Sequence, residues 1–380
     1  MVLAVLLKPA ARALVLFVLV AGFAVAIPGA AVAAPPVMPP DQFVQLGELY
    51  QATVSGVETG DTVNYGDGSE SQPLDVSAGS APLNHLYTSE GSFLITVTKA
   101  GSESASTYAH VFLPGALSQG SAFVGPGATG TVGIPGVTAT LTAPASNPDG
   151  STVVVATYAP SNPSFVAAGP TGSVLAGFDL RAVNAGGGRL VAVFSYPDPG
   201  DGSVPSLRFF NPATGTFVPV TGSAAVPDSL VVDPVNHTIT IVLDGTSFPS
   251  LTALRGTRFA VLGSPRINGL KARRCVGVGA KARLRFSLSQ AATVRVRLQR
   301  RRSSRQRSRC PRPSRPGRHR EVRLGGGPTI SEKLVAGRAT VRIPTRGLRP
   351  GRYRVTLTAV NAAGTSLERR VALVVLRPAG

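Results

Sequence analysis

Short segments in which apolar residues occupy every second position recur from Phe43 to the end of the chain. A period of two is typical of a β-strand, because successive side chains of a strand point to opposite faces of its sheet. The 43 glycines and 32 prolines favour turns between such strands and disfavour helices. No amphipathic helical repeat stands out. The sequence therefore predicts an all-β protein built from several small sandwiches.

The first 33 residues have the order of a bacterial export signal. Lys8 and Arg12 precede the apolar run 13–27, and the Ala-Val-Ala triplet ending at Ala33 supplies the small residues that a signal peptidase reads. We predict cleavage after Ala33. The alternative is an uncleaved anchor, although the run is short for a membrane span of about 20 residues.

Two further features of the sequence bear on whether the exported chain is anchored to the cell. No cysteine follows the apolar run directly, which argues against a lipoprotein. The C-terminal end carries neither a second apolar span nor a wall-sorting motif. We therefore expect an extracellular or envelope-associated protein with no transmembrane segment after signal removal.

Composition divides the remaining chain into modules. A Pro-rich linker at 34–41 leads into module one at 42–114, and Gly-rich turns open module two at 118–264. Module three, at 266–380, holds 30 basic and 3 acidic residues, a balance of +27. The rest of the chain holds 8 basic and 16 acidic residues. A chain of 380 residues has room for three such units.

Module one carries Tyr-Gly-Asp-Gly at 65–68, then His-Leu-Tyr at 85–87 and an alternating strand at 93–98. This order resembles PKD domains, which are Ig-like β-sandwiches of bacterial surface and secreted proteins. The resemblance covers most of the module, and Val63 stands where those domains usually carry Trp. It implies the first of a series of tandem Ig-like β-sandwich modules, with an unknown protein or carbohydrate partner.

Two residues of this pattern have physical roles that the sequence suggests. Asp67 lies between Gly66 and Gly68, which permit a tight turn with positive φ, and its carboxylate can bond the turn backbone. We interpret Asp67 as a turn-forming residue, with a catalytic or metal-binding carboxylate as the alternative. Tyr87 precedes a strand that begins with glycine and suits a corner that buries its ring.

Module two reads as a series of strands with one clear hairpin. Its predicted strands are 137–141, 152–158, 190–196, 207–210 and 238–243. The segment 209–220 predicts a hairpin around an Asn-Pro-Ala-Thr-Gly turn. It is similar to a recurrent segment of bacterial surface proteins, in which a closing Phe-Ala-Val follows, here at 259–261. That resemblance implies an all-β extracellular module and no known chemistry.

Alternation is plainest in module three. Apolar residues alternate with arginines in two successive strands, so Arg283, Arg285, Arg295 and Arg297 are expected on the solvent face. The end of the module is similar to the closing strands of Ig-like and fibronectin type III-like sandwiches of secreted actinobacterial proteins. This resemblance implies that Tyr353 is a tyrosine corner, whose hydroxyl bonds the backbone nearby.

The segment 300–320 is the most unusual part of the chain. It contains ten arginines and no Asp, Glu, Phe, Tyr or Trp, so it cannot bury a core and is predicted to be a disordered loop. One interpretation is electrostatic capture of an anionic cell-wall polymer or another polyanion. The alternative is a solvated insertion enlarged by the codon bias of a GC-rich genome, since the chain has 33 Arg and 5 Lys. The candidate polyanion-binding residues are Arg300, Arg301, Arg302, Arg305, Arg307, Arg309, Arg312, Arg315, Arg318 and Arg320.

The two cysteines of the chain are Cys275 and Cys310. An even count in an exported protein predicts a disulfide between them, with two reduced thiols as the alternative.

Residues with catalytic or metal-binding chemistry are few and scattered. The four histidines, His85, His110, His237 and His319, lack metal-ligand spacing, and no nucleophile-elbow or paired-carboxylate motif occurs. We predict no catalytic, cofactor-binding or metal-binding residue and no cofactor. The sequence thus favours a secreted or envelope-associated binding or spacer protein that is not an enzyme, whose basic module contacts anionic polymers. The alternatives are an accessory module protein of a secreted hydrolase system and a cryptic hydrolase in module two.

Overall fold

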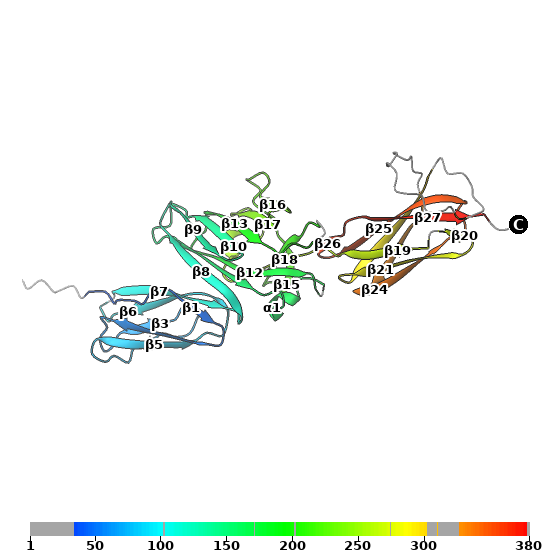
Figure 1. The fold of residues 1–380 in the computed structure, drawn as a ribbon. Helices are drawn as coiled ribbons and strands as arrows, with labels where there is room; N and C mark the ends of the chain where they lie inside the picture. The colour runs from blue at the N-terminus through cyan, green and yellow to red at the C-terminus, as the bar shows by residue number, and fades with distance from the viewer. Residues whose placement is uncertain are drawn as a thin grey trace, which may run out of the picture.

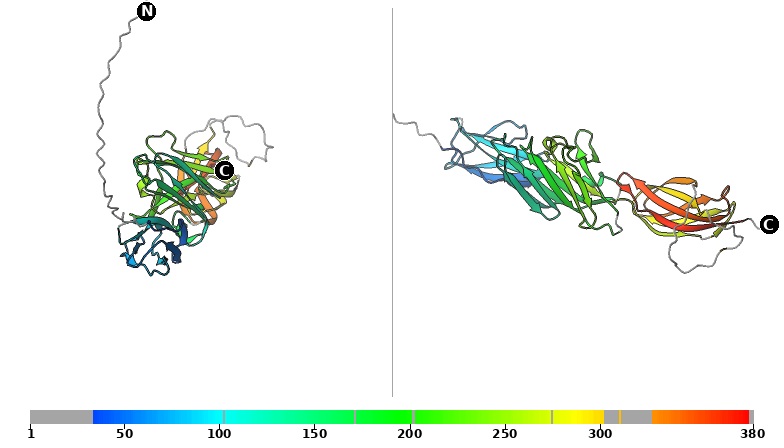
Figure 2. Two further views of the ribbon diagram at one scale, coloured as in Figure 1. Left: turned by 90° about the vertical axis from the view of Figure 1, so that its left-hand side faces the viewer. Right: turned by 90° about the horizontal axis from the view of Figure 1, so that it is seen from above.

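The computed structural model describes residues 34–101, 103–170, 172–200, 203–273, 275–301, 310 and 327–377. The predicted export signal at 1–33 lies outside the described residues. Three β-sandwiches follow one another in a row (Figures 1 and 2), which confirms the prediction of an all-β chain of tandem sandwich modules. The helical elements within these ranges are short, α1 (Pro163–Val166) and η1 (Leu251–Ala253). None of them is long and apolar enough to cross a membrane.

The strands of module one are β1 (Gln42–Gln45), β2 (Leu49–Ser55), β3 (Thr62–Asn64), β4 (Gln72–Pro73), β5 (Ser80–Leu86), β6 (Gly91–Thr98) and β7 (Ser104–Phe112). A five-stranded sheet in the order β1-β7-β6-β3-β4 faces the two-stranded sheet β2-β5. Residues at alternate positions, such as Ile95 and Val97 on β6, point into the core between the sheets and are fully buried. The alternating pattern of the sequence therefore identifies the inner face of this sandwich.

The strands of module two are β8 (Ala116–Val124), β9 (Thr129–Ile134), β10 (Val137–Thr142), β11 (Ser151–Tyr158), β12 (Val174–Val183), β13 (Arg189–Ser195), β14 (Ser206–Asn211), β15 (Thr216–Pro219), β16 (Leu230–Asp233), β17 (Thr238–Leu243) and β18 (Thr257–Leu262). They form two sheets, β16-β17-β13-β10-β9 and β15-β14-β18-β12-β11-β8. The predicted hairpin is present, because β14 and β15 pair across the turn between Asn211 and Thr216.

The strands of module three are β19 (Ile267–Ala272), β20 (Cys275–Gly277), β21 (Lys281–Leu288), β22 (Ala292–Arg300), β23 (Thr329–Leu334), β24 (Gly337–Pro344), β25 (Gly351–Asn361), β26 (Gly364–Thr365) and β27 (Arg369–Leu376). A three-stranded sheet, β19-β21-β24, packs against a larger one, β20-β27-β25-β22-β23, in which β26 also pairs with β25. Tyr353 donates a hydrogen bond from its hydroxyl to the carbonyl oxygen of Arg349 at 2.7 Å, so the expected tyrosine corner is present.

Module one covers part of the outer face of module two. Phe112, at the end of β7, joins a buried cluster with Val154, Ala156 and Tyr158 of β11 and with Phe165 of α1. All eight residues of β11 are consequently buried, since one face of the strand contacts the module core and the other faces this cluster. A strand covered on both faces lacks a strict apolar/polar alternation, and β11 accordingly carries four consecutive apolar residues at 153–156.

Module three meets module two through hydrogen bonds at the other end. Ser206 donates from Oγ to the carbonyl oxygen of Ala363 at 2.9 Å, and Gln290 donates from Nε2 to that of Gly263 at 2.9 Å. Ala363, between β25 and β26, is buried in the same outer-face cluster of module two. The row of modules in Figure 2 is thus held by specific contacts at both junctions.

Candidate functional site

The aspartate of the Gly-Asp-Gly turn bonds its own loop and a neighbouring strand. Asp67 accepts hydrogen bonds from the amide of Ser69 at 3.0 Å and from its hydroxyl at 2.6 Å, and Oδ2 lies 2.7 Å from Nε2 of His85 on β5. Burial alone would raise the pKa of Asp67, but the bonds from Ser69 and His85 lower it to about 2. Gly66 has a φ of 75°, and a Cβ there would lie 2.5 Å from the carbonyl oxygen of Leu94. These contacts fit the interpretation of Asp67 as a turn residue.

A serine, a histidine and an aspartate lie side by side on the sheet of module one that faces module two. Ser92 on β6 is the direct cross-strand partner of His110 on β7, and its Oγ is 2.9 Å from Nδ1. Asp41 lies before β1, with Oδ2 3.7 Å from Nε2 of His110, which is beyond hydrogen-bond distance. Asp41 instead accepts bonds from Thr107 and from the amide of Tyr108. This geometry ties three strands together and leaves His110 without the carboxylate hydrogen bond that orients a catalytic histidine.

A cryptic hydrolase in module two was one of the alternatives that the sequence allowed. His237 is the histidine of this module, and its Nε2 lies 3.5 Å from Asp198, while its ring is tilted against that of Tyr196. No serine hydroxyl bonds to His237 in the part of the chain that is described. Among the described residues, His237 thus lies near a carboxylate and has no serine bonded to it.

Two aspartates in turns of module two accept hydrogen bonds from backbone amides. Asp198 accepts from the amide of Gly200 at 2.7 Å, and Asp233 accepts from the amides of Val235 and Asn236. Asp201, in the same turn-rich segment as Asp198, lies outside the described residues. Among the residues that are described, no group of three or more metal-ligating side chains comes together.

A buried ionic cluster joins modules one and two, and sequence reasoning missed it. Arg181 on β12 is fully buried and contacts Asp179, with Nη2 2.5 Å and Nε 3.1 Å from Oδ2. The guanidinium also donates to the carbonyl oxygens of Gly91 and Val111 in module one and lies 4.3 Å above the ring of Phe112. A buried arginine with such a set of partners fixes the relative position of the two modules.

A second ion pair borders this cluster. Glu90 in module one lies 3.3 Å from Nε of Arg258 on β18, whose guanidinium also covers the ring of Phe210. Burial, together with the nearby charge of Asp179, raises the pKa of Glu90 to about 7, against the opposing effect of Arg258 and Arg181. The interface thus contains a carboxyl group that titrates near neutrality.

Module three presents a strongly basic outer face on the sheet β19-β21-β24, and we call this the basic face. Its β21 strand exposes Lys281, Arg283 and Arg285 at alternate positions, as the sequence predicted for the two arginines. The register sets Arg342 of β24 directly opposite Arg283, and Lys271 of β19 opposite Arg285. Arg338 on β24, which lies opposite Ser287, also belongs to the basic face.

The basic face lacks neutralising partners. No carboxylate pairs with Lys271, Lys281, Arg283, Arg285 or Arg342 within the described chain. The described acidic residues of module three lie elsewhere, Glu332 on β23 and Glu368 beside Arg370.

A surface hollow of about 570 Å³ opens on this face. It is lined by Lys271, Ala272, Arg273, Lys281, Arg283 and Arg285.

The Arg-rich segment is described only at its start. Arg300 donates from Nη2 to the carbonyl oxygen of Pro350 at 3.1 Å, and the amide of Arg301 bonds the carbonyl oxygen of Arg352. The other eight predicted arginines lie outside the described residues. Cys275 and Cys310 form a disulfide, as their even count predicted, with Cα atoms 5.8 Å apart. The disulfide therefore anchors the middle of this segment to β20.

No family model matches the sequence, and no curated protein matches it. Among solved structures, the chain is similar to trypsin-activated α-2-macroglobulin from Escherichia coli, at 13% identity and a TM-score of 0.20, over 90% of this chain and 23% of that one. It is also similar to the chicken CNTN1 FN1-FN3 domains, at 10% identity and a TM-score of 0.18, over 90% of this chain and 100% of that one. A polysaccharide lyase matches over 76% of this chain and 40% of its own length, at 10% identity and a TM-score of 0.18. No function is carried over from similarities this weak.

Proposed function

We propose that this protein is a non-catalytic binding and spacer protein of the cell exterior, and that module three contacts anionic polymers. The observation that carries the proposal is the basic face, above all Arg283 and Arg342, which lie directly opposite each other without a carboxylate partner. Like charges at such a position destabilise a sheet. A fold that keeps them gains from a ligand that neutralises both.

The spacing of the charges suits an extended ligand. Alternate residues of a strand on one face are roughly 6.6 Å apart, so β21 presents a regular row of cations along its length. Exposed charges attract a polyanion without sequence specificity, and salt screens the attraction beyond about 8 Å at physiological ionic strength. The supported ligand is therefore a linear polyanion, such as an anionic wall polymer, bound in a salt-dependent manner.

The test compares two variants of equal charge loss. Arg283→Gln/Arg342→Gln removes the opposed pair of the basic face, whereas Arg295→Gln/Arg297→Gln removes two exposed arginines of β22 on the other sheet. The measurement is the salt concentration that elutes each protein from heparin. We expect the first variant to elute at clearly lower salt than the second. Equal elution of both variants and the wild type would contradict the proposal.

The Arg-rich segment is a separate candidate contact. A deletion of residues 300–309 removes six arginines and keeps Cys310, so the disulfide with Cys275 can still form. If the segment binds polyanions, the deletion lowers the elution salt further when it is combined with the basic-face variant. If it is an insertion due to codon bias, the deletion leaves elution unchanged.

We further propose that the chain is exported with cleavage after Ala33 and that module one is a PKD-type domain. Support for the domain comes from its Ig-like sandwich, the bond between Asp67 and His85, and the Tyr87 hydroxyl that bonds the carbonyl oxygen of Tyr65 at 3.2 Å. Support for export comes from the disulfide, which persists in oxidising compartments. Mass analysis of the protein from culture medium and from a high-salt wash of cells should find a chain that begins at Ala34. An intact Met1 would contradict export by cleavage.

A further inference from the structure

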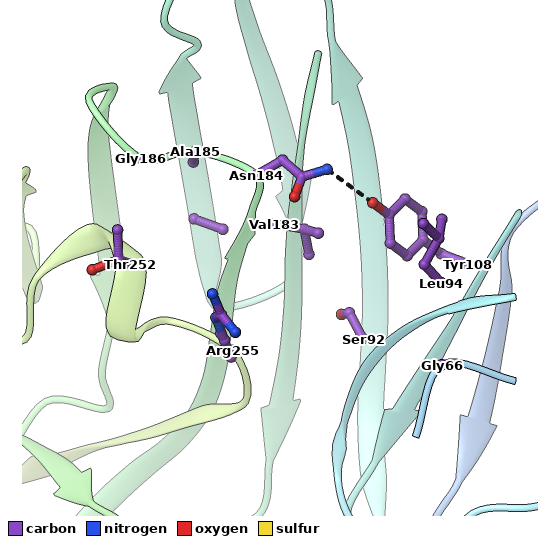
Figure 3. A pocket seen from close by; sticks show the side chains of 11 residues that line it. Gly66, Ser92, Leu94, Tyr108, Val183, Asn184, Ala185, Gly186, Thr252 and Arg255 are labelled. Carbon is purple, nitrogen blue, oxygen red and sulfur yellow. Dashed lines mark hydrogen bonds between the residues drawn. The ribbon is translucent and has the colours of Figure 1, made fainter. Parts of the chain in front are cut away.

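A pocket of about 320 Å³ lies where modules one and two meet, and we call it the junction pocket (Figure 3). Module one contributes Ser92 and Tyr108 on one side, and module two contributes Thr252 and Arg255 on the other, with Asn184 between them. Pockets of about 300–1,000 Å³ at domain interfaces are frequent ligand sites. The position and size of this pocket therefore suit a small ligand.

The walls of the pocket are held in place by the ionic cluster described above. Arg181 is one residue from Ala182 of the lining, and it bonds the carbonyl oxygens of Gly91 and Val111 in module one. Across the pocket, Asn184 donates from Nδ2 to the hydroxyl of Tyr108 at 3.2 Å. These bonds join the two modules beside the pocket, so its shape is set before a ligand arrives.

Arg255 supplies the charge of the pocket. Its guanidinium is exposed and has no hydrogen-bond or ion-pair partner within the described chain. No acidic residue is found among the described residues that line the pocket. A free guanidinium binds a carboxylate through two parallel N–H···O bonds, which gives direction as well as charge.

The remaining polar groups favour a ligand with hydroxyls. The Oγ of Ser92 lies 2.9 Å from Nδ1 of His110, and Ser92 lines the pocket. A serine hydroxyl has one donor and two acceptor positions, so Ser92 keeps hydrogen-bonding capacity for a ligand. Asn184 Oδ1 and the Thr252 hydroxyl add further polar atoms, and Leu94 with the Tyr108 ring adds an apolar wall.

We propose that the junction pocket binds a carboxylated sugar unit of the uronic acid type. The carboxylate would pair with Arg255, and the ring hydroxyls would bond Ser92, Asn184 and Thr252. This site is distinct from the basic face, because it takes one charged unit in a pocket between modules one and two, whereas the basic face takes an extended polymer on module three.

The test is a saturation-transfer difference NMR titration of the full exported chain with D-glucuronate, with D-glucose as the uncharged sugar of the same ring. We expect saturable binding of glucuronate, and binding of glucose weaker by about tenfold or more, since a charge-assisted pair is lost. Arg255→Gln should lose the same factor. Arg255→Lys keeps the charge without the two-pronged geometry and should fall between.

Arg189→Gln is the matched control. Arg189 is also an exposed, unpartnered arginine of module two in the described chain, but it lies outside the junction pocket. It should leave glucuronate affinity unchanged. The proposal is overturned if glucuronate shows no saturable binding, if glucose binds as tightly, or if Arg189→Gln weakens binding as much as Arg255→Gln.

Discussion

Arg181 shows how one side chain sets the geometry of two modules. The residue is fully buried, and its partners in module one are 90 and 70 positions away in sequence. Removing one partner of a buried ion pair leaves the other charge uncompensated, which costs far more than a lost surface contact. Local sequence reasoning assigns such an arginine to solvent, because arginines are rarely fully buried unless they are paired.

Arg181→Met should lower the free energy of unfolding by about 3–5 kcal/mol, because Asp179 would remain buried without its cation. The double variant Arg181→Met/Asp179→Leu should recover much of that loss, since no charge is orphaned. Urea unfolding of both variants, with Arg189→Met as the exposed control, measures the difference. An equal loss for the single and the double variant would show that packing, and not the ion pair, holds the interface.

Glu90 makes the stability of the same interface depend on pH. Its pKa is raised from 4.5 to about 7, mainly by burial, so the folded protein holds a proton that the unfolded chain has released. The stabilisation is fully present below about pH 4.5 and is lost as the pH rises towards 7. Glu90→Gln should flatten this decline in urea unfolding measured across that range. A decline that is unchanged in the variant would assign it to another group.

At the level of strands, the like charges of the basic face lower the stability of the sheet and favour the binding of a polyanion. Arg342→Thr removes the charge opposite Arg283 and places a strand-favouring residue there, so it should raise the free energy of unfolding by roughly 0.2–1 kcal/mol. The same change should lower the salt at which heparin releases the protein. Arg295→Thr is the control, because Arg295 lies opposite the neutral Thr358 and Ser331 and should gain no comparable stability. A stability gain of equal size in both variants would reflect net charge alone.

The strands that the sequence revealed are those with one face in water. On β21, arginines alternate with buried Leu284 and Phe286, and the period of two is visible without a structure. On β12, Asp179 and Arg181 interrupt the apolar run, although both are buried, because module one covers that face. The contact that buries them is made by another module, so no local sequence pattern predicts their burial.

The two candidate sites differ in the same way. The exposed arginines of β21 follow from alternation, but their pairing with Arg342 depends on a strand register set by about 60 intervening residues. The junction pocket draws on segments as distant as Ser92 and Arg255. Charge on a face is therefore readable from sequence, whereas convergence of groups from separate modules requires the fold.

The whole molecule is unequally joined at its two junctions. Module one contributes Phe112 to the buried outer-face cluster of module two and completes the bonds of Arg181, whereas the contribution of module three to that cluster is Ala363. Loss of module one therefore exposes more of module two than loss of module three.

A chain that begins at residue 115 should accordingly unfold at a lower temperature and associate, because the outer face of β11 and the Arg181 pair become exposed. A chain that ends at residue 264 should remain folded and monomeric. Thermal unfolding with light scattering of the two truncated proteins checks this expectation. Equal behaviour of the two would show that the junctions contribute alike.

The Arg181 contacts also have a consequence in time. A chain that emerges from its N-terminal end completes module one before β12 follows, so the carbonyl oxygens of Gly91 and Val111 are already in position when Arg181 arrives. The guanidinium then bonds to acceptors on a module that is already folded, and module two packs against module one as it folds. The order of appearance along the chain thereby shortens the time for which the face of module two around Arg181 is without its cover from module one.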